Sequence, residues 1–93
     1  MKYRPEYNMQ VVGRNLRRLR EQKNLSVEEV RDYLCLGSVQ AVYKYETGKG
    51  YPQVDTMFAL MELYGADMYD ITRDYEDAEA LHSAVPGETK KVA

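Results

Sequence analysis

The sequence predicts an all-α fold, a compact bundle of about five short helices. Apolar residues recur at the three- and four-residue spacing of helices in successive short segments, and helix-capping residues precede several of them. No segment alternates apolar and polar residues in the way a half-buried strand does. With 93 residues, 44% of them apolar and 30% charged, the chain has the size and composition of one ordinary globular domain.

The first helix is predicted over residues 9–23, after an N-terminal arm at residues 1–8. Its apolar stripe consists of Val12, Leu16 and Leu19, which recur at helical spacing. The arginines of this segment lie mostly off the stripe, so we expect them to face solvent.

The second helix has a capping box at its start. Ser26 can accept from the backbone three residues later, and Glu29 can reach back to the Ser26 backbone. We expect the helix to run to about Leu36 and to end at Gly37, because glycine readily takes the left-handed conformation. The residues expected to face inward are Val30, Tyr33 and Leu34.

Ser38 is expected to cap a third helix over Val39 to Glu46. Projection at the helical angle divides this helix into two faces. The inner face holds Ala41, Val42 and Tyr45, and the outer face holds Val39, Gln40, Tyr43 and Lys44.

The fourth helix is predicted from Val54 or Asp55 to Tyr64, with Gly65 after its end. It is apolar nearly all round, so we expect it to be buried, either centrally or against a partner. The fifth helix starts after Asp67 and reaches at least residue 72. Whether it continues to about residue 84 stays open, because the later stretch is strongly acidic.

The second and third predicted helices, joined by a short glycine-containing turn, form a helix-turn-helix arrangement. Around it the chain carries, in order, Leu16-Arg17-Arg18-Leu19-Arg20, Leu25-Ser26-Val27-Glu28-Glu29-Val30, Tyr45-Glu46-Thr47-Gly48-Lys49, Pro52 and Leu60-Met61-Glu62-Leu63-Tyr64-Gly65. With these motifs, residues 11–72 resemble the lambda-repressor-like (Cro-like, XRE-type) helix-turn-helix DNA-binding domain family. The sequence departs from that family at Val27, where a phosphate-contacting glutamine is usual, and in the turn 35–37, which is one residue longer.

The chain therefore divides into four predicted parts: the arm at 1–8, a helix-turn-helix domain at 9–72, an acidic C-terminal extension at 73–85, helical or not, and a flexible tail at 86–93. Charge is distributed unevenly between the two halves. Residues 1–50 hold 10 Lys and Arg against 6 Asp and Glu, whereas the remainder holds 3 against 9. This asymmetry suggests that two faces of the domain have different functions.

The resemblance makes the outer face of the third helix the expected base-reading surface, because the DNA major groove admits one α-helix. Gln40 can bond an adenine edge at two points, and Lys44 can donate to guanine acceptors. Val39 can contact a thymine methyl group, and Tyr43 can pack on a sugar or donate to a phosphate. The alternative is an ordinary exposed polar face without a ligand.

Phosphate contacts are expected from the residues at the two ends of this helix. The candidates are Ser38 at its start and Thr47, Lys49 and Tyr51 in the loop that follows. The resemblance further implies a structural ion pair between Arg20 and Glu46, which would join the first helix to the third.

Other classes of function find little support in the sequence. Cys35 is the single cysteine, His82 is the single histidine, and no nucleophilic triad, phosphate loop or metal-ligand cluster is present. We therefore expect no enzymatic activity, no cofactor and no metal. The longest apolar run, 57–61, is too short for a membrane span, and without a secretory signal the expected location is the cytoplasm.

Two functions remain. The first is a sequence-specific, repressor-like transcriptional regulator that binds double-stranded DNA as a homodimer. The second is a protein-interaction module on the same fold, such as an antitoxin or adaptor, with the acidic C-terminal region and the fourth helix as its contact surface.

Overall fold

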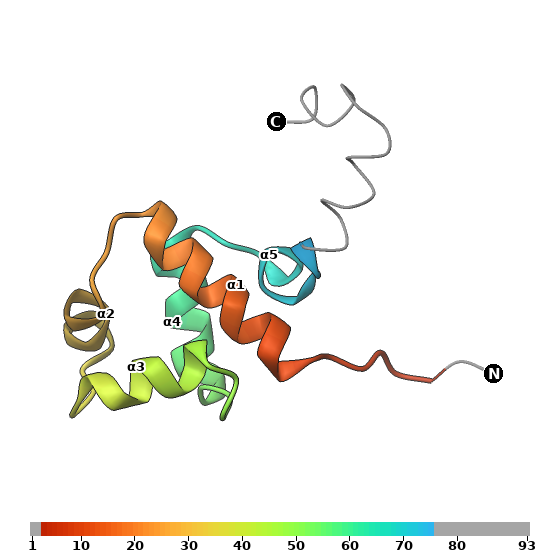
Figure 1. Ribbon diagram of the computed structural model, residues 1–93, viewed down its shortest axis with the longest axis horizontal. Coiled ribbons are helices and arrows are strands. Elements are labelled where there is room, and N and C mark those ends of the chain that lie inside the picture. The colour runs from red at the N-terminus through yellow and green to blue at the C-terminus, as the bar shows by residue number, and fades with distance from the viewer. Residues whose placement is uncertain (1–2, 76–93) are drawn as a thin grey trace, which may run out of the picture.

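The computed structural model describes residues 3–75, and within that range the regular structure is entirely helical (Figure 1). The helices are α1 Met9–Gln22, α2 Val27–Leu34, α3 Val39–Glu46, α4 Val54–Tyr64 and α5 Met68–Thr72. The all-α prediction is confirmed. The predictions for residues 76–85 of the acidic extension and for the tail at 86–93 lie outside the described residues.

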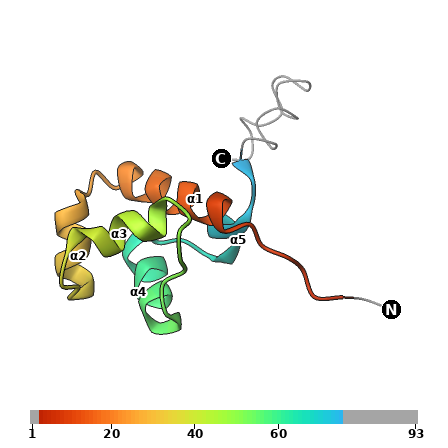
Figure 2. The same cartoon turned by 60° about the horizontal axis from the view of Figure 1, so that its bottom comes forward.

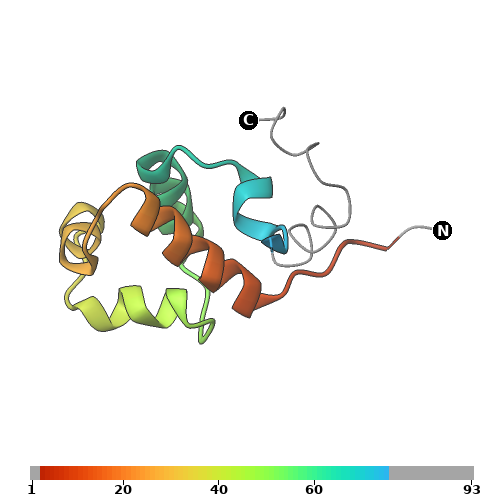
Figure 3. The ribbon, with the colours of Figure 1, turned by 45° about the horizontal axis from the view of Figure 1, so that its top comes forward.

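Helix α1 lies between α3 and α5 and packs against both (Figures 1 and 3), and α2 packs against α3 and α4. Side chains from all five helices meet in one apolar core, because each helix turns a stripe of apolar residues toward it. The core residues are Val12, Leu16, Val27, Val30, Val42, Leu60, Tyr64 and Ile71. The N-terminal arm, described from residue 3, extends away from this bundle (Figure 2).

Several predicted helix ends are confirmed. In α2, the Ser26 hydroxyl accepts from the backbone N–H of Glu29 at 3.0 Å, and the Glu29 carboxylate accepts from the backbone N–H of Ser26 at 2.8 Å. Asp67 caps α5 with a second box of this kind. Gly65 follows α4 in the left-handed conformation, with φ of 62°. Local signals therefore determine where three of the helices begin or end.

The predicted end of α2 is wrong. The helix ends at Leu34, and Cys35 rather than Gly37 takes the left-handed conformation, with φ of 58°. Its backbone N–H bonds back to the last helical turn, which offsets part of the cost of positive φ in a non-glycine residue. Tyr33 is also not inward but 48% exposed, because the inner stripe of α2 consists of Val27, Val30 and Leu34.

Asn15 sets the end of α5. Its side-chain Nδ2 donates to the carbonyl oxygens of Ile71 at 2.7 Å and Arg73 at 2.8 Å, so α1 holds both residues. Arg73 is extended, with ψ of 148°, and α5 stops at Thr72. A single helix from residue 68 to residue 84 is therefore wrong. The sequence did not predict the hydrogen bonds of Asn15 to the end of α5, because a polar residue beside an apolar stripe does not indicate which distant residue it contacts.

Candidate nucleic-acid interface

The outer face of α3 presents three of its four predicted base-reading residues to solvent. Gln40, Tyr43 and Lys44 are exposed, and Tyr43 retains 45% of its accessible surface. Val39 is partly buried, because its side chain packs against the apolar core. The exposed outer face therefore consists of an amide, a phenol and an ammonium group.

The inner face of α3 is fixed to the rest of the bundle. Val42 is 2% exposed and lies in the core, and Tyr45 packs against the same cluster. One turn after Val42, Glu46 is buried with its carboxylate turned toward α1. This burial determines which side chains of α3 can reach a ligand.

Arg20 and Glu46 form the ion pair that the resemblance implied. Arg20 Nε lies 2.6 Å from Glu46 Oε2 and Nη2 lies 3.1 Å from Oε1, so the contact is bidentate. Arg20 Nη1 also donates to the carbonyl oxygen of Leu25 at 2.9 Å, just before α2. The hydrogen bond to Glu46 raises the pKa of the Arg20 guanidinium above its usual value. One guanidinium therefore joins α1, the start of α2 and the end of α3.

The backbones of α1 and α3 approach each other closely at Gly13. A Cβ atom placed on this glycine would lie 2.6 Å from the carbonyl oxygen of Glu46 and 2.8 Å from that of Tyr45. Gly13 thus allows a helix crossing that any larger residue would obstruct. In the sequence it is simply a poor helix former in the first turns of α1.

The predicted phosphate-contacting residues fall in different surroundings. Ser38 is exposed at the start of α3, and its hydroxyl makes no capping hydrogen bond, contrary to expectation. Thr47 Oγ1 donates to the carbonyl oxygen of Tyr43 at 2.7 Å. Because phosphate oxygens only accept hydrogen bonds, Thr47 in this arrangement has no hydroxyl hydrogen left to donate to them.

Lys44 and Lys49 carry the exposed charge of this region. Lys49 is exposed in the loop after α3, and the Lys44 side chain lies over Gly50 of the same loop. The single carboxylate within residues 38–51 belongs to Glu46, which is buried and paired with Arg20. The α3 helix and its following loop therefore present two ammonium groups without an exposed carboxylate.

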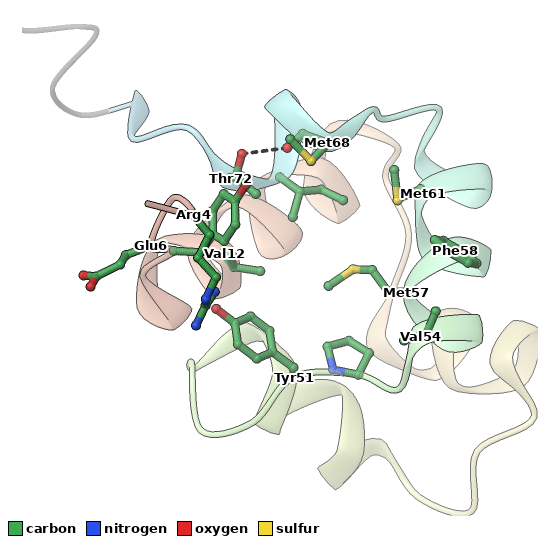
Figure 4. A pocket seen from close by; sticks show the side chains of 13 residues that line it. Arg4, Glu6, Val12, Tyr51, Val54, Met57, Phe58, Met61, Met68 and Thr72 are labelled. Atoms are coloured by element: carbon green, nitrogen blue, oxygen red, sulfur yellow. Dashed lines mark hydrogen bonds between the residues drawn. The ribbon is translucent and has the colours of Figure 1, made fainter. Parts of the chain in front are cut away.

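Tyr51 lies on a different surface. It lines an open groove of about 640 Å³ between the N-terminal arm, α4 and α5 (Figure 4). Met57 and Met61 of α4 point into this groove, and Val54 and Phe58 lie along its edge. The fourth helix was expected to be buried because it is apolar nearly all round, but within the described residues only its side with Leu60 and Tyr64 is buried, whereas Val54 and Phe58 are exposed. Sequence reasoning did not predict the groove.

Membrane-spanning helices and metal-binding clusters are both absent from residues 3–75. No helix in this range is long and apolar enough to cross a membrane. No three or more His, Cys, Asp or Glu side chains of the same range gather in a way that could hold a metal ion. His82, the single histidine, lies outside the described residues.

Comparison with known proteins gives one family. A model described as a helix-turn-helix domain matches residues 11–74, which include most of α1 and all of α2 to α5. No curated protein matches the sequence.

Proposed function

Because the chain belongs to the helix-turn-helix domain family, we propose that it is a sequence-specific, repressor-like transcriptional regulator of the lambda-repressor-like type. The observation that carries this proposal is the division of α3 into a buried, ion-paired inner face and an exposed outer face of hydrogen-bonding groups. The α3 helix enters the major groove of double-stranded DNA. There the Gln40 amide reads adenine, since its NH₂ group can donate to N7 while its oxygen accepts from the N6 amino group.

Phosphate binding comes from the ends of the same helix. Lys49, exposed in the loop after α3, neutralises phosphates on one side of the groove, whereas Lys44 is a base-reading residue that donates to guanine acceptors. At the start of α3, no side chain caps the first backbone N–H groups, and these groups donate to a further DNA phosphate. These contacts orient α3 but carry no sequence information.

One α3 helix reads only a few base pairs, so the regulator acts as a homodimer. Two copies related by a two-fold axis would read two half-sites about one helical turn, or about 34 Å, apart. The preferred DNA sequence should therefore be an inverted repeat.

Selection of bound sites from a random DNA pool tests the proposal directly. Gln40→Ala should remove about 1–3 kcal/mol of base discrimination per half-site and relax the selected sequence. The matched control is Gln22→Ala, since Gln22 is an exposed glutamine at the end of α1. It should leave the selected sequence unchanged.

A second pair of variants tests the phosphate contacts. Lys49→Ala should weaken binding to all DNA sequences alike. It should also flatten the slope of log affinity against log salt concentration by about 0.9 for each phosphate contact that is lost. Lys23→Ala, at an exposed lysine just after α1, should change neither affinity nor slope. If no sequence is preferred, and Gln40→Ala and Lys49→Ala both leave binding untouched, the DNA-reading proposal fails.

One observation favours a second function, a protein-interaction module such as an antitoxin or adaptor. The groove beside α4 exposes apolar side chains that the described chain leaves uncovered. Binding of another protein through α4, together with no DNA binding that depends on α3, would support this alternative.

A further inference from the structure

Helix α4 is apolar on two sides, and only one of them is buried. Leu60 and Tyr64 face the core and are 2% and 3% exposed. On another side, Val54 and Phe58 are 68% and 63% exposed. Because these two residues are four apart, they form one ridge along the helix surface. A surface helix of a monomer usually has polar residues at such positions.

Beside this ridge lies the groove of about 640 Å³. Val12 and Ile71, both buried, contribute to its lining, and Met57 and Met61 point into it from α4 (Figure 4). The groove is large enough for an aromatic side chain. It also has flexible methionine walls, which adapt to the shape of an inserted group.

Exposed apolar surface is concentrated here. Of the nine large hydrophobic side chains exposed within residues 3–75, five line the groove or its edge. They are Tyr7, Tyr51, Val54, Phe58 and Met68. Contiguous apolar patches of this kind mark interaction surfaces, whereas single exposed hydrophobic residues do not.

We propose that the occupant of this groove is the α4 ridge of a second copy of the same chain. A ridge and a groove on one face are self-complementary under a two-fold axis. Each copy inserts its Phe58 beside Met57 and Met61 of the other, so both grooves are filled at once. This proposal rests on the proposed function in one respect, since it supplies the homodimer that reading an inverted repeat requires.

The area involved indicates a weak dimer. The five exposed side chains amount to roughly 500 Å² from each copy, or about 1,000 Å² in total, close to the lower limit for a specific interface. We therefore expect a dissociation constant between about 1 μM and 1 mM in the absence of DNA. Binding to two adjacent half-sites then favours the dimer, since each copy holds the other at a high effective concentration.

The test compares two exposed aromatic residues. Phe58→Asp places a charge in the proposed interface, whereas Tyr69→Asp makes the same change at a residue of α5 that is 71% exposed and does not line the groove. Sedimentation equilibrium of the full chain should show self-association for the wild type and for Tyr69→Asp. Phe58→Asp should raise the dimer dissociation constant by about 30-fold or more. Circular dichroism melts should show that both variants stay folded, because neither side chain is buried.

The proposal is overturned if the wild type stays monomeric at millimolar concentration, or if it dimerises and Phe58→Asp has no larger effect than Tyr69→Asp. A wild-type monomer that instead binds another protein through Phe58 would overturn it in favour of the interaction module. Because sedimentation is measured without DNA, its result is independent of base reading. If the chain forms a dimer that depends on Phe58 but shows no DNA binding that depends on α3, the proposed function is refuted and the dimer proposal stands.

Discussion

The contact between α1 and α3 at Gly13 allows a quantitative prediction. In Gly13→Ala, the new methyl group would lie 2.6 Å from the Glu46 carbonyl oxygen and 2.8 Å from that of Tyr45. A relaxed carbon–oxygen contact is about 3.3 Å or longer, so the two helices must separate by roughly 0.5–0.8 Å. Both obstructing atoms belong to the backbone, and no side-chain rotation can relieve the contact.

Two opposing effects determine the magnitude. Overpacking of this kind costs about 1–3 kcal/mol, and alanine recovers up to about 1 kcal/mol of helix propensity over glycine. We expect a net decrease of about 1–2 kcal/mol in the free energy of unfolding. For a domain of this size that decrease lowers the melting temperature by about 5–15 °C.

Thermal and urea denaturation followed by circular dichroism measure this change. Gly37→Ala is the matched control, because a Cβ atom on Gly37 would have no neighbour within 4 Å. We expect that variant to be as stable as the wild type or slightly more stable. A Gly13→Ala protein that melts at or above the wild-type temperature would show that the two helices are not in contact at this point.

Three other substitutions test the remaining contacts. Arg20→Met should lower the free energy of unfolding by about 3–5 kcal/mol in urea denaturation, because it leaves the Glu46 carboxylate buried without a partner. Replacement of both Arg20 and Glu46 by Met should restore most of that stability. Asn15→Leu should lower the free energy of unfolding by about 2–4 kcal/mol in the same assay, because the carbonyl oxygens of Ile71 and Arg73 lose their hydrogen-bond donor. An unchanged midpoint of the urea unfolding curve would show that water hydrogen-bonds these oxygens in the variant. Val27→Gln should lower stability by about 1–2 kcal/mol, because it places an amide in the core, and stronger DNA binding at unchanged stability would contradict this.

Much of the fold was predictable because its signals are local. The capping box at Ser26, the glycine at residue 65 and the apolar stripe of α1 each involve neighbours within one or two turns of helix. Such short-range patterns determine where helices begin, end and face. The all-α class and the order of the five helices follow from them.

The features that the sequence did not reveal depend on distant contacts. Asn15 bonds to atoms 56 and 58 residues later, and Gly13 touches the end of α3. The end of α2 was misplaced for another reason. Gly37 is the residue expected to take positive φ, but Cys35 takes it, and the chain turns there so that Leu36, beyond the end of α2, also packs against the core.

Val27 has a structural role at a position where the sequence differs from the lambda-repressor-like family that it resembles. In the lambda-repressor-like family a glutamine is usual here, where it contacts a DNA phosphate. In this chain Val27 is 7% exposed and belongs to the core with Val30. The start of α2 therefore contributes to stability through this side chain, and in the proposed complex phosphate binding falls to Lys49 and the start of α3.

The two faces of α3 have separate physical roles, and this leads to a last prediction. Glu46 on the inner face is held by Arg20, whereas the exposed Gln40 side chain takes part in none of the hydrogen bonds described for residues 3–75. A surface side chain without such contacts contributes little to folding, so Gln40→Ala should change the free energy of unfolding by less than about 0.5 kcal/mol. Its melting curve should overlay that of the wild type while its preferred DNA sequence relaxes. A melting temperature lower by several degrees would show instead that Gln40 supports the fold, and the weaker base discrimination could then no longer be assigned to a direct contact with DNA.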